Sequence, residues 1–110
     1  MSEHRARQLV YARSAGVCER CGQSRATEWH HRRNRSQGGR WTAANGLHLC
    51  GGCHRWITEH PDEAAEAGRG WVVWAWQNPV EVPVRHAVYG LVVLDDCGGM
   101  TLTLDAELHR

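Results

Sequence analysis

Residues 18–57 read CERCGQSRATEWHHRRNRSQGGRWTAANGLHLCGGCHRWI, and this stretch decides the fold. Two Cys-x-x-Cys pairs, Cys18/Cys21 and Cys50/Cys53, frame it with 28 residues between them. Each pair can form a tight turn that presents two thiolates to one ion. Together the pairs predict a closed tetrahedral Cys₄ site, which suits a structural Zn²⁺. A redox pair and buried free thiols are the alternatives, and Cys97 is expected to be an ordinary thiol.

The segments around the cysteine pairs predict an α+β chain. Periodicity and turn residues give the expected elements in this order: a helix over 3–15, a strand over 26–31, a polar loop over 32–40, a strand over 47–49, a helix over 54–60, and a helical turn opened by Pro61.

From Trp71 onward the sequence changes character. The segments WVVWAW, VEVPV, AVYGLVVLDD and MTLTL are rich in β-formers and are separated by Asn78-Pro79, Gly90 and residues 95–99. This pattern predicts a small antiparallel hairpin or meander, with the tryptophans of residues 71–76 in the core. The expected organisation is one domain over 1–110, with a core over 1–70 and a β-rich extension over 71–110.

Length and hydropathy bound the class of protein. A chain of 110 residues buries a modest core, so a metal staple would help it fold. No apolar run of about 18 residues predicts a membrane span. Residues 1–10 are polar, so we expect no signal peptide and a cytoplasmic location, where thiols stay reduced.

The net charge of +1 conceals an asymmetry along the chain. Residues 1–55 contain ten arginines and three acids, whereas residues 56–110 contain three arginines and nine acids. The formal charges of the two halves are therefore +7 and −6. The basic half is the one expected to meet a polyanion.

Three histidines and an asparagine fall within or just after the cysteine frame: His30, His31, Asn45 and His54. Hydrolysis of a phosphodiester needs a base to activate water and a cation to stabilise charge on the phosphoryl group. A neutral imidazole is a natural base near pH 7, and two further imidazoles can hold a divalent ion. An amide nearby can fix the loop that carries the base.

These residues, with the SQGG loop at 36–39, closely resemble the HNH endonucleases of the ββα-metal class. The best match is their zinc-stapled branch, and the tail is similar to small phage-encoded HNH proteins of actinobacteria. The resemblance implies that His31 is the general base and that His30 and His54 bind a divalent ion (Mg²⁺, Mn²⁺, Ni²⁺ or Zn²⁺). It implies that Asn45 orients the base or its loop. The implied products carry 5′-phosphate and 3′-hydroxyl ends.

The resemblance also makes DNA the expected partner. Arginine forks fit phosphate oxygens, so the arginines near the histidines are expected to contact the DNA backbone. A solvated basic loop is the alternative, and the last of them could equally face solvent. The candidates are Arg32, Arg33, Arg35, Arg40 and Arg55.

One position departs from the family pattern. Many relatives carry a further ligand four residues after the helix histidine, where this chain has Thr58. The alternative function is therefore a zinc-dependent DNA-binding module with a weak or degenerate nuclease site. The resemblance to phage proteins adds a possible partner, the terminase of a phage packaging complex. A homodimer is a further possibility, because two copies could cut both strands.

Overall fold

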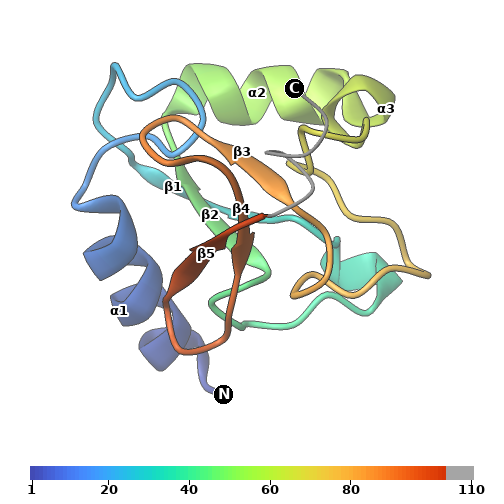
Figure 1. Cartoon of the computed structure of the whole chain (residues 1–110), viewed down its shortest axis with the longest axis horizontal. Coiled ribbons are helices and arrows are strands. Elements are labelled where there is room, and N and C mark those ends of the chain that lie inside the picture. The colour runs from blue at the N-terminus through green and yellow to red at the C-terminus, as the bar shows by residue number, and fades with distance from the viewer. Residues whose placement is uncertain (104–110) are drawn as a thin grey trace.

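The computed structural model describes residues 1–103, which fold as a mixed α and β chain (Figure 1). The predicted α+β class is therefore confirmed. In chain order the elements are α1 (Glu3–Ser14), β1 (Glu28–His31), the 3₁₀ helix η1 (Arg35–Gln37), β2 (Gly46–Leu49), α2 (Gly51–Glu59), α3 (Pro61–Ala64), β3 (Val84–His86), β4 (Gly90–Leu94) and β5 (Met100–Leu102).

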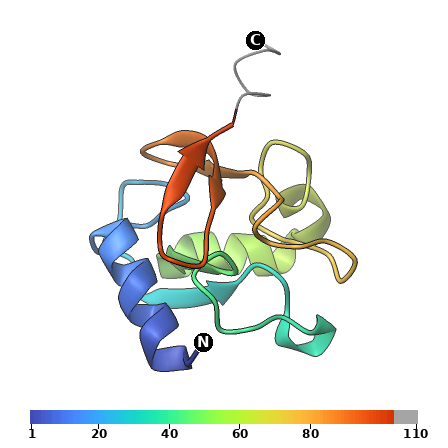
Figure 2. The ribbon, with the colours of Figure 1, turned by 60° about the horizontal axis from the view of Figure 1, so that its bottom comes forward.

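The ββα unit consists of β1, β2 and α2. The two strands pair antiparallel, with Glu28 opposite Leu49 and His31 opposite Gly46, and α2 packs against β1. Helix α1 packs on β2, beside this unit (Figure 2). Gly46 is required in this register, because a Cβ atom there would lie 2.1 Å from the ring of Trp29.

Helix α1 begins and ends close to where the sequence predicts. The Ser2 side chain caps its start by accepting a hydrogen bond from the Arg5 amide, which satisfies one of the free amides of the first turn. At the other end Ala15 takes a left-handed conformation, with φ of 54°, and Gly16 follows.

The predicted start of the second long helix at residue 54 is wrong, because α2 begins at Gly51. Cys50 is its N-cap, and the Cys50 sulfur accepts a hydrogen bond from the Cys53 amide. Thus the second cysteine pair spans the helix start, where amides lack partners within the helix.

The C-terminal part contains fewer strands than the sequence predicts. The antiparallel meander is confirmed in β3, β4 and β5, which pair in that order. The strands expected within 71–76 and 80–83 are absent from the described structure, and residues 71–83 form turns instead. The backbone of this segment bonds elsewhere: the Trp71 amide donates to the Ala64 carbonyl, and the Val73 amide donates to the Arg32 carbonyl.

The hydrophobic core joins the ββα unit to the C-terminal meander. It includes Leu47 and Leu49 of β2, Ile57 of α2 and Leu94 of β4, each at most 1% exposed. Burial of such side chains is the main favourable term in folding. Among residues 1–103, no helix combines the length and apolar composition that crossing a bilayer requires.

A buried ionic network ties α1 to both sheets. The Glu19 carboxylate accepts two hydrogen bonds from the Arg13 guanidinium, at 2.8 and 2.9 Å, and lies 3.0 Å from Nε2 of His86. Burial raises the pKa of Glu19, but the hydrogen bonds from His86 and Arg13 outweigh burial and hold this pKa at about 2. Glu19 is therefore ionised and fully paired at neutral pH.

Candidate active site and cysteine cluster

The four paired cysteines lie together. Their Sγ atoms are all within 4.8 Å of one another, although the two pairs come from the turn after α1 and from the start of α2. A tetrahedral zinc with Zn–S bonds of about 2.3 Å would place its sulfurs about 3.8 Å apart. The donor set and this spacing are consistent with a zinc site.

Backbone and side-chain donors surround the sulfurs. The Cys21 and Gln23 amides donate to the sulfurs of Cys18 and Cys21, and the Arg20 guanidinium lies 3.2 Å from the Cys53 sulfur. Burial raises the pKa of Cys21, but hydrogen bonds from the backbone of Gln23 and Ser24 lower it to about 6. Burial raises the pKa of Cys18 and of Cys53, so of these three thiols the donors favour the thiolate that a metal requires at Cys21 alone.

His30 has one ring nitrogen in a hydrogen bond and one that is free. Its Nε2 atom lies 2.7 Å from the Trp71 carbonyl oxygen, which can only accept, so Nε2 carries the proton. Nδ1 is therefore the nitrogen with a free lone pair. Burial lowers the pKa of His30 to about 4, which keeps the ring neutral at pH 7.

His54 is oriented in a complementary way. Its Nδ1 atom lies 2.6 Å from a carboxylate oxygen of Glu28, which leaves Nε2 free, and its ring centroid is 5.2 Å from that of His30. A carboxylate behind a histidine is a usual arrangement at metal sites, because it fixes the tautomer and increases ligand basicity. Nδ1 of His30 and Nε2 of His54 could hold a divalent ion between them.

His31 lies among aromatic rings on the other face of β1. Its ring makes an edge contact with Trp41, at 4.4 Å between centroids. Nε2 of His31 is buried and has no hydrogen-bond partner among the described residues. Burial, then the positive charges of Arg35 and Arg7, lower the pKa of His31. The ring is therefore neutral at pH 7 and able to accept a proton.

One cavity of about 510 Å³ brings the three histidines together. Alternation along the strand places His30 and His31 on opposite faces, yet both line this cavity. The strand ends at His31, so the cavity can extend around its end. Its other walls come from the loop after β1, from α2 and α3 and from the segment after α3, and include Asn34, Arg35, Ser36, Ile57, Thr58, Pro61 and Trp74.

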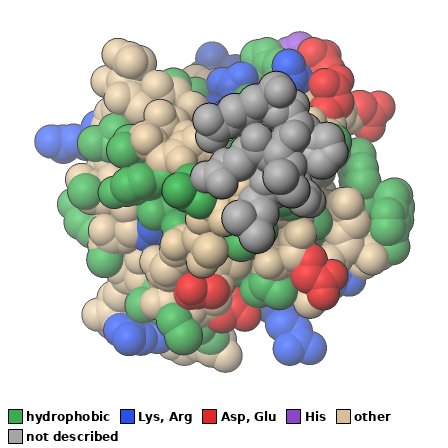
Figure 3. Space-filling view, in the orientation of Figure 1, with side chains coloured by type: hydrophobic (Ala, Val, Ile, Leu, Met, Phe, Trp, Pro, Cys, Tyr) green, Lys and Arg blue, Asp and Glu red, His purple; other side chains and the backbone are tan. Residues whose placement is uncertain are grey.

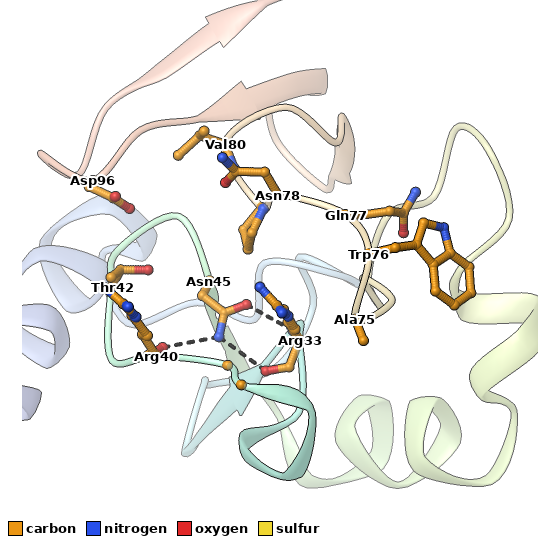
Figure 4. A pocket seen from close by; sticks show the side chains of 13 residues that line it. Arg33, Arg40, Thr42, Asn45, Ala75, Trp76, Gln77, Asn78, Val80 and Asp96 are labelled. Atoms are coloured by element: carbon orange, nitrogen blue, oxygen red, sulfur yellow. Dashed lines mark hydrogen bonds between the residues drawn. The ribbon is translucent and has the colours of Figure 1, made fainter.

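Asn45 fastens the loop that follows His31. Its Oδ1 accepts from the Arg33 amide at 2.8 Å, and its Nδ2 donates to the carbonyls of Arg33 and Arg40, at 3.2 and 3.0 Å (Figure 4). The side chain is buried. Of the two roles that the resemblance implies for Asn45, these contacts support the one on the loop. Gly39 allows the loop to close, because a Cβ atom there would lie 1.7 Å from the Arg33 carbonyl oxygen.

The predicted DNA contact of Arg32 is wrong. Its side chain is 1% exposed, and its guanidinium donates to carbonyl oxygens from three parts of the chain. The acceptors are the carbonyls of Ala44, Gly70, Pro79 and Val82. Burial lowers the pKa of Arg32 to about 9, so it remains charged at pH 7 while out of reach of phosphate.

The other four candidate arginines reach the surface. Arg35, Arg40 and Arg55 are exposed, and Arg33 is half-buried. Arg35 lines the histidine cavity, whereas Arg33 and Arg40 line a second cavity of about 660 Å³ beside Asn45 (Figure 4). The larger cavity therefore lies beside the loop that follows His31, but none of the three histidines lines it. Acidic side chains gather over α3, at the upper right of Figure 3, and the first residue of α3, Pro61, lines the histidine cavity.

Two residues of the site have roles that the sequence pattern does not predict. Glu28 lies two residues before His30, on the same face of a strand, and that spacing is the signal that indicates it. Thr58 stands at the position that departs from the family pattern. Its hydroxyl instead donates to the His54 carbonyl at 2.9 Å, one helical turn earlier.

Comparison with known proteins identifies the central segment. Residues 18–59 match the family model described as HNH endonuclease. The matched stretch, residues 18–59, is called the HNH segment below. The comparisons with curated proteins and with solved structures gave no match. The HNH segment begins at the first paired cysteine and ends at the last residue of α2, so it contains both cysteine pairs and all four His/Asn positions. HNH segments are associated with nucleases and with DNA binding. The resemblance to phage-encoded proteins of actinobacteria stays a prediction.

Proposed function

We propose that this protein is a metal-dependent endonuclease that hydrolyses DNA phosphodiester bonds to 5′-phosphate and 3′-hydroxyl ends. One observation carries the proposal: three histidines from β1 and α2 of the HNH segment line a single cavity. In His30 and His54 one ring nitrogen is hydrogen-bonded and the other is free, and His31 is neutral at pH 7 because burial lowers its pKa. Phosphodiester hydrolysis needs both functions: ligands for a cation and a neutral base that can activate water.

Each residue has a separate task in this proposal. His30 and His54 hold the divalent ion, which when bound supplies positive charge to the scissile phosphate and the leaving 3′ oxygen. His31 accepts the proton of the attacking water, and its lowered pKa keeps it unprotonated at pH 7. Arg35, which lines the same cavity, is placed to contact a phosphate. Asn45 holds the loop that carries Arg35 and closes behind His31.

The test is cleavage of plasmid DNA with Mg²⁺, Mn²⁺, Ni²⁺ or Zn²⁺ supplied in turn. We expect His31→Ala to lose cleavage by about two orders of magnitude or more, the usual contribution of a general base, while DNA binding and zinc content stay unchanged. His4→Ala is the matched control, because His4 is an exposed residue of α1. Equal cleavage by the wild type and His31→Ala would remove His31 from the mechanism.

A second candidate function is a zinc-dependent DNA-binding module with a weak or degenerate nuclease site. It is favoured by the sparse ligand set: among residues 1–103, the cysteine cluster is the only place where three or more His, Cys, Asp or Glu side chains meet as metal ligands. Retained DNA binding without cleavage in any of the four ions would select this function. Partnership with a phage terminase, homodimer formation and a cytoplasmic location stay proposals.

A further inference from the structure

Trp76 is the most exposed large apolar side chain in residues 1–103. The sequence predicts it in the core, but its side chain is 80% exposed, whereas Trp71, five residues earlier, is 8% exposed. Single exposed apolar residues are common, but a fully presented indole beside a candidate active site is a surface that a ligand can use.

The exposed indole is held on a closed turn. The Gln77 amide donates to the Trp74 carbonyl at 3.0 Å, and the Gln77 side-chain oxygen accepts from the Trp74 amide at 2.9 Å. The ring of Trp76 stacks on that of Trp74, with centroids 6.0 Å apart and planes 22° apart. The turn is anchored next to β1, because the Val73 amide donates to the Arg32 carbonyl. Binding to this indole would therefore cost little ordering of the chain.

The turn 74–77 lies between the two cavities. Trp74 lines the cavity that contains the three histidines, whereas Trp76 and Gln77 line the cavity that contains Arg33 and Arg40. Figure 4 shows the Trp76 indole projecting outward from the turn, away from Asn45. A DNA strand with one phosphate bound in the histidine cavity would therefore pass the rings of Trp74 and Trp76.

We propose that Trp76, stacked on Trp74, binds an unpaired nucleobase of the DNA next to the cleaved phosphate. The inference rests on the proposed function, because the histidine cavity supplies the phosphate position. Bases stack on aromatic side chains, while arginines beside them hold the backbone, and Arg33 and Arg40 provide that charge here. A paired base inside a duplex has both faces covered, so an indole can stack only on a base that has left the helix.

The proposal gives the protein a preference for DNA structure. We expect tighter binding to single strands, and to duplexes with a gap or an unpaired base, than to a continuous duplex of the same length. Asp96 also lines the second cavity, where one of its carboxylate oxygens accepts a hydrogen bond from the Ala44 amide, and its single negative charge stands against the two positive charges of Arg33 and Arg40.

The experiment measures affinity by fluorescence anisotropy of labelled oligonucleotides, with the full chain and no added catalytic ion. The substrates are a single strand, a continuous duplex and a duplex with one unpaired base. Trp76→Ala should weaken binding to the first and third by about tenfold or more, the usual effect of losing one base stack. It should change binding to the continuous duplex less than about twofold. Trp76→Phe should retain most of the affinity. Tyr89→Ala, which removes another exposed aromatic side chain later in the chain, should leave the affinity for all three substrates unchanged.

The outcomes separate this inference from the proposed function. If Trp76→Ala binds all three substrates as the wild type does, or loses affinity equally for all three, the stacking proposal is wrong while cleavage by the wild type can still stand. If the wild type binds none of the substrates, both proposals are wrong. An unchanged circular dichroism spectrum checks that Trp76→Ala folds, as its exposure leads us to expect.

Discussion

Glu28 and His54 show how much of the site depends on single hydrogen bonds. The Glu28 carboxylate fixes His54 through Nδ1, and the Trp71 carbonyl fixes His30 through Nε2. Each contact decides which nitrogen is free. The proposed metal site has only two histidine ligands and would depend strongly on such orientation, because no third ligand would compensate for a misplaced ring.

Replacing Glu28 tests this dependence. Glu28→Gln keeps an acceptor near His54 but removes the charge, and we expect affinity for the catalytic ion to fall by about 10- to 100-fold. The measurement is the concentration of Mn²⁺ or Mg²⁺ that gives half-maximal cleavage. Glu59→Gln, an exposed acid at the end of α2, should leave that concentration unchanged. Loss of the cysteine-bound zinc in Glu28→Gln would contradict a role confined to His54.

Asn45 has a structural task that its position in the motif does not reveal. Asn45→Ala would leave one half-buried amide and two carbonyls of the loop 33–40 without their partner, and we expect a loss of about 2–4 kcal/mol in the free energy of unfolding. Urea unfolding measures this loss. Asn34→Ala, at an exposed position of the same loop, should cost less than about 1 kcal/mol. Equal stability of the two variants would show that the loop does not need Asn45.

At the scale of elements, the segment 71–83 replaces the strands that its sequence predicts. It packs over the end of β1 and α3 through backbone hydrogen bonds to Arg32 and Ala64. The Arg32 guanidinium donates to the carbonyl of Gly70, just before the segment, and to that of Val82, near its end. Pro79 and Pro83 lack the amides that a strand ladder uses, which makes an irregular path less costly here. One consequence is the turn that presents Trp76.

Arg32 should therefore matter for stability, and Arg40 for DNA binding. Arg32→Ala should lower the free energy of unfolding by about 3–5 kcal/mol, because four carbonyls, two of them in buried and two in part-buried hydrogen bonds, lose a charged donor. Arg32→Lys should rescue little of this loss, since an ammonium cannot reproduce the planar fork. Thermal unfolding measures both variants.

The exposed arginine gives the matched comparison for Arg32. Arg40→Ala should unfold at nearly the wild-type temperature but bind DNA more weakly, and it should reduce the slope of log affinity against log salt by about 1. If Arg32→Ala unfolds at the wild-type temperature and reduces the slope of log DNA affinity against log salt, Arg32 contacts phosphate after all.

At the scale of the whole molecule, the cysteine cluster joins the turn after α1 to the start of α2, and the Glu19 network joins the same turn to β2 and β3. Both connections span long stretches of chain. A chain of this size has a modest core, so such links carry much of its stability.

Cys50→Ser tests the metal link. Cys50 is both a member of the cluster and the N-cap of α2, and we expect its replacement to abolish tight zinc binding and to unfold the chain in part. Elemental analysis should find one zinc per wild-type chain, and circular dichroism should report the loss of fold. Cys97→Ser, outside the cluster, should retain the zinc. A fully folded Cys50→Ser protein without zinc would contradict the structural role.

The sequence by itself determined the features that depend on local spacing. The two Cys-x-x-Cys pairs, the His30-His31 pair, Asn45 and His54 stand at intervals that indicate the cysteine cluster, the ββα unit and the HNH match, because each ligand pair and each strand is a short run of neighbouring residues. Tertiary structure decided what each side chain meets. Arg32 is buried while Arg33 reaches a cavity, and Trp71 is buried while Trp76 is exposed. These differences arise from contacts between residues about 40 to 50 positions apart, such as Arg32 with Pro79 and Val82, and burial at such separations is invisible to local pattern.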